Sequence, residues 1–176
     1  MDIDTYWTLV EQARERAGVA GGAPDPDEVA AALTALLVEQ GASAARGASS
    51  AYSALAAQAY GWPLWGAAYT IGGGCSDDGF EYFIGWLVAQ GREAFERAVA
   101  DPDSLADLVD ESTDAECEDL MGAPREAYET LTGSSDIEDG TDSETTPLPA
   151  LGEGWDFDDV DLVRERYPRL AAIFLD

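Results

Sequence analysis

Aromatic residues are concentrated between residues 60 and 89, around three consecutive glycines at positions 72–74. Three of the five tryptophans, Trp62, Trp65 and Trp86, lie in this stretch. Glycine is a poor helix former that readily adopts a left-handed conformation, so three glycines in a row end a helix. We therefore expect two apolar helices joined by a tight turn, packed at the centre of the fold.

Apolar residues recur at helical spacing through most of the chain, and no convincing run alternates as a strand would. The run Asp25-Pro26-Asp27-Glu28 is typical of a helix start, and Gly41 of a helix end. Ser76 is predicted to cap the helix after the glycines, with Asp77 and Asp78 in its first turn. These signals predict an all-α fold: a single compact domain of about seven to nine short helices in orthogonal packing.

Four further features follow from local patterns. Thr113 and Glu116 are spaced as a capping box, and Pro124 suits the first turn of a helix that continues to residue 131. Asp156 is predicted to cap a helix near the C-terminus. In the helix after the glycines, Trp86 is expected to flank the buried face rather than belong to it.

The chain divides into three regions by composition. Residues 1–133 are predicted to form the helical core. Residues 134–154 are rich in Gly, Ser, Thr, Asp, Glu and Pro with few apolar residues, which is typical of an acidic mobile loop. Residues 155–176 are predicted to form a C-terminal helical clasp that packs on the core.

Charge is strongly negative and uneven. The net charge is −27, and all nine cationic side chains are arginine. Residues 101–176 hold 23 of the 36 acidic residues and only four of the arginines. Such a field repels nucleic acid and anionic membranes and attracts cationic molecules. We therefore expect a basic protein partner, with no nucleic acid and no membrane as partners.

Several classes of chemistry are excluded by residues that the chain lacks. It has no histidine, so it cannot form a Ser-His or Cys-His catalytic pair by itself. It has no lysine for a phosphate-binding P-loop, and its two cysteines are too few for a zinc site. We expect no cofactor and no metal. The acidic start Met1-Asp2-Ile3-Asp4 is unlike a secretory signal, so we expect a cytoplasmic protein with Cys75 and Cys117 reduced.

Three residues after the glycines are candidates for catalysis. Cys75 lies just before a helix start, where a thiol pKa can fall, although the acidic neighbours oppose this effect. Asp77 and Asp78 are candidates for acid–base chemistry, and Asp78 with Glu81 can converge on a hard cation. The structural alternative is a buried inert thiol followed by acids that stabilise the helix start.

The aromatic residues of the same stretch are candidates for ligand binding. Tryptophan and tyrosine rings can enclose a cation or a planar small molecule, and they also serve simply as core residues. The candidate ligand-binding residues are Trp62, Trp65, Tyr69, Ser76, Tyr82 and Trp86.

The arrangement of these motifs resembles a bacterial family, the domain-of-unknown-function family 4240. The matching segments are Asp4-Thr5-Tyr6-Trp7, Trp62-Pro63-Leu64-Trp65, Gly72-Gly73-Gly74-Cys75-Ser76-Asp77-Asp78-Gly79-Phe80 and Asp101-Pro102-Asp103-Ser104-Leu105. The resemblance extends over about residues 1–131 and implies no activity.

Two main hypotheses for function remain. The first is a small acidic cytoplasmic protein, immunity-like or regulatory, that binds a basic partner and has no catalytic machinery. The alternative is an enzyme or small-molecule-binding accessory protein of a biosynthetic pathway, with its pocket at the segment from Trp62 to Trp86. A third reading, a DNA mimic, requires carboxylates spaced like phosphates on one face. Whether the protein is an enzyme is left undecided by these patterns.

Overall fold

The computed structural model describes residues 1–18, 25–137 and 146–175, and these residues form nine α-helices and one 3-10 helix without any strand. The all-α prediction is confirmed. The elements are α1 (Ile3–Arg16), α2 (Pro26–Gln40), α3 (Ala42–Ala59), α4 (Trp62–Gly72), α5 (Asp77–Ala89), α6 (Arg92–Ala100), η1 (Pro102–Asp107), α7 (Glu118–Thr132), α8 (Val160–Arg166) and α9 (Pro168–Phe174). No helix in these ranges is long and apolar enough to cross a membrane.

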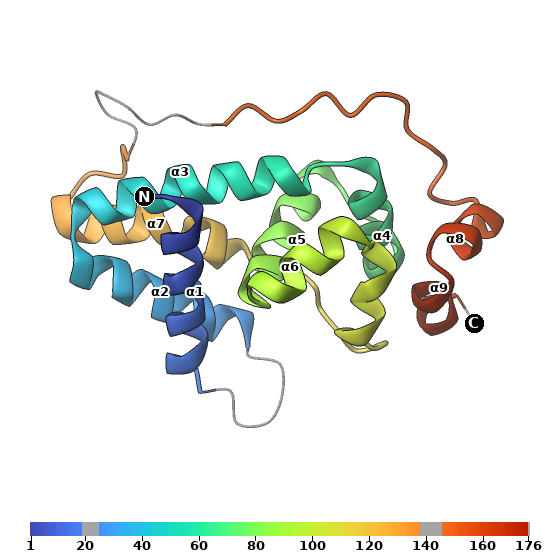
Figure 1. Ribbon diagram of the computed structural model, residues 1–176, viewed down its shortest axis with the longest axis horizontal. Helices are drawn as coiled ribbons and strands as arrows, with labels where there is room; N and C mark the ends of the chain where they lie inside the picture. The colour runs from blue at the N-terminus through green and yellow to red at the C-terminus, as the bar shows by residue number, and fades with distance from the viewer. Residues whose placement is uncertain (19–24, 138–145, 176) are drawn as a thin grey trace.

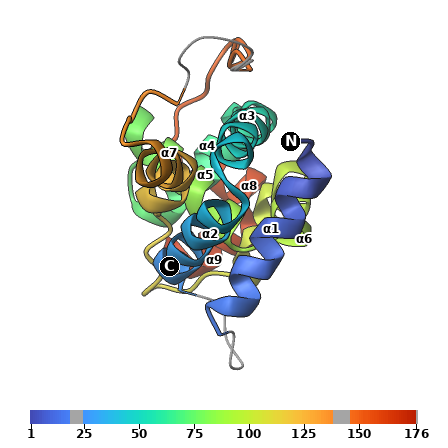
Figure 2. The same ribbon diagram turned by 90° about the vertical axis from the view of Figure 1, so that its left-hand side faces the viewer.

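Helix α5 contacts α1, α2, α3, α4, α6 and α7. Helices α1, α2, α3 and α7 occupy one half of the molecule and α4, α8 and α9 the other, with α5 and α6 between them (Figure 1). The contact between α2 and α7 is the most extensive, and α3 packs against both. In Figure 2, which views α3 and α7 nearly end-on, α2 lies between α7 and α1.

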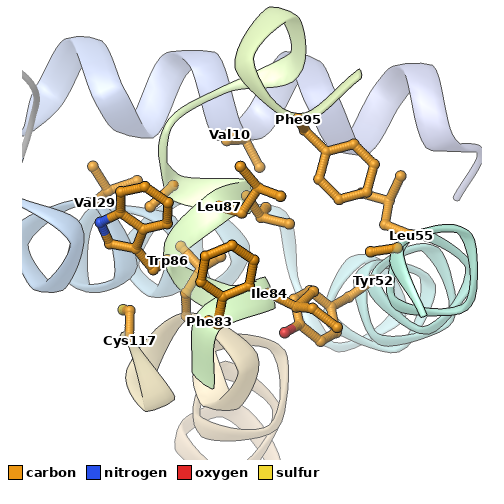
Figure 3. Close-up of a cluster of buried hydrophobic side chains, with 14 of the residues drawn as sticks. Val10, Val29, Tyr52, Leu55, Phe83, Ile84, Trp86, Leu87, Phe95 and Cys117 are labelled. Atoms are coloured by element: carbon orange, nitrogen blue, oxygen red, sulfur yellow. The ribbon is translucent and has the colours of Figure 1, made fainter. Parts of the chain in front are cut away.

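Helix α5 is the centre of the core. Figure 3 shows its side chains Phe83 and Leu87 surrounded by residues from α1, α2, α3 and α6. Trp86 is only 4% exposed, so the prediction that it flanks the buried face was wrong. The reason is that α2 and the start of α7 cover a second side of α5, so that its residues from Phe83 to Ala89 are all buried.

The predicted starts of α2 and α5 and the predicted end of α2 are confirmed. The Asp25 carboxylate accepts from the N–H groups of Asp27 and Glu28, and the Ser76 hydroxyl accepts from the N–H of Gly79. Gly41 ends α2 with a φ of +94°, which favours glycine. These boundaries were predictable because each bond joins residues two or three positions apart.

The predicted start of α7 was wrong. The helix begins at Glu118, five residues after Thr113 and six before Pro124. The N–H of Cys117 donates to the carbonyl oxygen of Tyr82 (3.0 Å), and this contact with α5 fixes where α7 begins. Pro124 lies inside the helix and is buried, and we attribute the tolerance of its missing N–H to packing against α2 and α5.

The C-terminal helices pack against α4 and η1. Asp159, not Asp156 as predicted, caps α8, because Asp156 accepts from the N–H of Asp158 in a preceding turn. The buried Asp103 of η1 accepts from the N–H groups of Arg169 and Leu170 at the start of α9. Between α7 and α8, residues 146–151 run along α3 (Figure 1). The predicted loop 134–154 includes residues 138–145, which lie outside the described residues, and its mobility stays a prediction.

Candidate functional site

The turn between α4 and α5 forms one wall of an open recess. Gly73 ends α4 with a left-handed φ of +64°, and Gly74 follows with a φ of +149°. Residues with a side chain rarely adopt either value, so this turn requires glycine. The N–H of Gly74 donates to the carbonyl oxygen of Tyr69 (3.0 Å), which closes the turn before Ser76 begins α5. At these glycines, the backbone itself therefore faces the recess, because glycine has no side chain to cover it.

The opposite wall is the loop between η1 and α7. The Asp110 carboxylate accepts from the N–H and the hydroxyl of Ser112 (2.9 and 2.6 Å), and the hydroxyl of Thr113 accepts from the N–H of Asp110. The bonds from Ser112 are the main reason that the pKa of Asp110 is lowered. Because these bonds are local, the loop holds its own shape.

The recess combines an apolar surface with carboxylates. Its volume is about 320 Å³. It is lined by Ala68, Ile71, Gly72, Gly74, Cys75, Gly79, Phe83, Glu111, Ser112, Thr113, Asp114, Ala115 and Glu116. None of these residues is cationic, so the three carboxylates have no arginine within the lining. This combination suits the side chain of arginine or lysine, whose methylene stem packs on apolar surface while its charged head meets carboxylates.

Carboxylates continue from the recess across the exposed side of α5. We call Asp77, Asp78, Glu81, Glu116 and Glu118 the acidic face; all five are exposed. The contact between Cys117 and Tyr82 brings the start of α7 beside α5 and so joins the two groups of acids. At the centre of the face, Glu118 is the main cause of a raised Tyr82 pKa, followed by burial and by the other nearby carboxylates. The acidic face therefore carries a concentrated negative field.

Cys75 is positioned at the recess but is not activated. Burial raises the pKa of its thiol to about 11, and the charges of Glu116 and Asp77 add to this effect. Its carbonyl oxygen accepts from the indole N–H of Trp65 (3.2 Å), which ties the residue to the core. The thiol is consequently protonated at neutral pH, whereas nucleophilic catalysis requires the thiolate.

Asp77 and Asp78 lie in the first turn of α5, where the helix dipole stabilises negative charge. Within the described residues, no group of three or more acidic or thiol side chains is arranged to hold a metal ion. The geometry thus places these two aspartates as exposed charges beside the recess.

Two of the predicted ligand-binding aromatics are core residues. Trp65 is 6% exposed and stacks on Phe80, with ring centroids 4.5 Å apart and planes 10° from parallel. Trp86 packs on Phe83 at 5.6 Å and is buried (Figure 3). Neither ring lines the recess.

Two others lie beneath the C-terminal segment. The indole N–H of Trp62 donates to the carbonyl oxygen of Gly152 (3.3 Å), and the hydroxyl of Tyr69 donates to Asp158 (2.7 Å). Between them on α4, a side chain at Gly66 would overlap the ring of Trp155. This face of α4 is therefore occupied by the chain itself.

The structure separates the predicted site residues into three places. Ser76 and Tyr82 lie with Cys75, Asp77 and Asp78 near the recess and the acidic face, whereas the four remaining aromatics lie in the core or under the C-terminal segment. Sequence reasoning missed Glu111 and Asp114 as site residues. The signal that points to them is the acidic run over residues 110–119, which holds six carboxylates and no cation.

Comparison with known proteins identifies a family. The model of a family described as a protein of unknown function, DUF4240, matches residues 1–130. No curated protein and no solved structure matches the chain.

Proposed function

Since the chain belongs to the DUF4240 family, whose function is unknown, we propose from the recess and the acidic face that it is a cytoplasmic protein that binds a basic partner protein. It neutralises or regulates that partner, as immunity proteins do. One observation carries the proposal: the recess joins an apolar surface to three carboxylates that no lining cation neutralises. An arginine or lysine of the partner fits that surface.

The pairing of arginines elsewhere supports the same proposal. Arg14, Arg16, Arg92, Arg97 and Arg169 pair with carboxylates outside the recess and the acidic face. Arg46 and Arg166 lie over the rings of Tyr128 and Trp155. These seven arginines thus interact away from the recess and the acidic face, whose carboxylates attract a cationic partner.

The alternative function, an enzyme with Cys75 as nucleophile, has less support. The raised pKa of Cys75 keeps the thiol protonated, and the chain has no histidine to accept its proton. A small-molecule pocket formed by the rings of Trp62 and Trp86 has little support, because these rings face the C-terminal segment and the core respectively. The recess also lies in this segment of the chain, but carboxylates and small residues line it instead of these rings.

Calorimetric titration with short peptides tests the proposal. The probe is acetyl-tetra-arginine amide, and its neutral counterpart has citrulline at all four positions. The recess variant is Glu111→Gln, Asp114→Asn, Glu116→Gln. A control variant, Glu15→Gln, Glu126→Gln, Glu129→Gln, removes the same charge from exposed residues that do not line the recess. We expect the recess variant to bind the arginine probe roughly ten- to hundredfold more weakly than the control, because each of the three lost carboxylate contacts contributes roughly 0.5–1 kcal/mol.

Equal affinity of the two variants would show that the probe senses net charge alone and would contradict the recess as the contact site. Equal binding of the arginine and citrulline probes would contradict cation recognition altogether.

A further inference from the structure

A groove of about 280 Å³ lies between α3, α5 and α7 and shares no lining residue with the recess. Its longest wall is one side of α3, where residues three or four positions apart point the same way. These residues are Ser49, Tyr52, Ser53, Ala56 and Tyr60. Ile84 and Met121 line the groove from α5 and α7, and Thr146 and Leu148 line it from the segment that runs along α3.

The bottom of the groove is built from rigid core residues. Tyr52 and Ile84 are nearly fully buried and lie side by side (Figure 3). Tyr60 is half-buried, and its ring packs against the rings of Trp65 and Phe80, with centroids 5.7 and 5.9 Å away. Because packed helices hold these side chains, an apolar group can leave water for the groove without any rearrangement of the fold.

One carboxylate gives the groove its charge. Glu81 is the only charged residue among the described residues of the lining, and none of the ion pairs in the described part of the chain involves it. Burial is the main reason that the pKa of Tyr52 is raised, and the charges of Tyr6 and Glu81 add to this effect. The negative charge of Glu81 therefore acts on the phenol at the bottom of the groove.

This lining suits a ligand that combines a positive charge with an apolar body. The face of a tyrosine ring attracts a cation, and a carboxylate accepts strong hydrogen bonds from an ammonium group. Ala56, Ile84 and Met121 offer apolar surface beside them. An anion would instead meet Glu81 without a cation in the described lining to balance it. The volume lies just below the usual range of about 300–1,000 Å³ for ligand pockets, so the ligand is small.

We propose that this groove binds a small organic amine, whose ammonium group lies between Glu81 and the rings of Tyr52 and Tyr60 while its apolar body packs on Ile84 and Met121. This site is separate from the recess, and it does not depend on the basic partner proposed above. It gives the protein a second ligand of a different class, a free small molecule.

An NMR titration of the full chain tests the proposal with three probes. The first is 2-phenylethylamine, a primary amine that is protonated at neutral pH. The second, 2-phenylethanol, keeps the apolar body without the charge, and the third, methylamine, keeps the charge without the body. We expect 2-phenylethylamine to bind roughly fivefold more tightly than the alcohol and roughly tenfold more tightly than methylamine. The largest shifts should fall on the amides of Tyr52, Ala56 and Ile84.

Two charge variants isolate the role of Glu81. We expect Glu81→Gln to weaken the binding of 2-phenylethylamine roughly fivefold and to leave that of 2-phenylethanol unchanged. Glu118→Gln is the matched control, because it removes the same charge from an exposed residue of the acidic face that does not line the groove. It should bind both probes as the unaltered protein does. A third variant, Ala56→Phe, fills the groove from α3 and should weaken both probes.

Three results would overturn the inference. They are equal binding of 2-phenylethylamine and 2-phenylethanol, equal effects of Glu81→Gln and Glu118→Gln, and largest shifts on residues 72–79 and 111–116, which would place the amine in the recess. None of them bears on the basic partner, since that proposal fails only if the arginine and citrulline peptides bind alike or the recess variant matches its control.

Discussion

At Cys75, two opposing influences act on one thiol. The residue lies two positions before the start of α5, and a helix start favours a thiolate. Half-burial and the neighbouring Glu116 and Asp77 favour the protonated form, and they prevail, with a pKa raised to about 11. The local sequence reveals the first influence and one neighbouring acid, but not Glu116, which is distant along the chain.

The reactivity of Cys75 follows from this balance. We expect iodoacetamide to alkylate it about 100-fold more slowly at pH 7.5 than an unperturbed thiol, because a pKa about two units higher leaves a hundredfold less thiolate. The rate should rise with pH towards a midpoint near 11. Peptide mapping by mass spectrometry separates Cys75 from the buried Cys117, whose pKa burial raises to about 12. Rapid alkylation at neutral pH would instead favour the enzyme alternative.

Residues whose roles depend on near neighbours were predictable, and those brought together by folding were not. The cap formed by Ser76 involves Gly79, three residues away, so the sequence alone indicates it. Gly74 and Glu116 line the same recess, and nothing in the spacing of the chain indicates that they share it. Tyr82 was expected beside an aromatic pocket and lies instead among carboxylates.

At the scale of helices, the crossing of α5 and α7 determines where the acidic face forms. A side chain at Gly85 of α5 would overlap the carbonyl oxygen of Cys117, so the two helices approach closely only because that side chain is absent. The same crossing explains why the predicted starts of α7 at Thr113 and Pro124 were wrong. A local capping pattern cannot indicate a contact with a helix thirty residues earlier.

Two glycine substitutions measure this crossing. We expect Gly85→Ala to lower the free energy of unfolding by roughly 1–3 kcal/mol, because the added carbon pushes α7 away from α5. Gly122→Ala on α7 is the matched control, since nothing lies within 4 Å of the added carbon. It should raise stability by roughly 0.5–1 kcal/mol by reducing backbone freedom in the unfolded chain. Urea unfolding followed by circular dichroism gives both values. Equal effects of the two substitutions would contradict the close crossing.

Over the whole molecule, the family match and the candidate site coincide. Every residue that lines the recess falls between Ala68 and Glu116, inside the matched residues 1–130. The C-terminal segment that covers Trp62 and carries Leu148 lies outside the match. The region shared with the family therefore contains the recess and the acidic face.

Composition predicted the class of the fold and the sign of its field, because helical periodicity and net charge are properties of the whole chain. It did not predict where the field is concentrated. That depends on the contact of Cys117 with Tyr82 and on the loop held by Asp110, which together place acids from α5, α7 and the loop on one side.

Chemical-shift mapping by NMR during titration with acetyl-tetra-arginine amide tests the central claim, that the recess is where a cationic side chain binds. The account predicts that the largest shifts fall on the amides of Gly72, Gly74 and Gly79 and on residues 111–116. Shifts spread evenly over exposed acids, including Glu126 of α7 and Asp161 of α8, would contradict it, since they would show an acidic surface without a specific site.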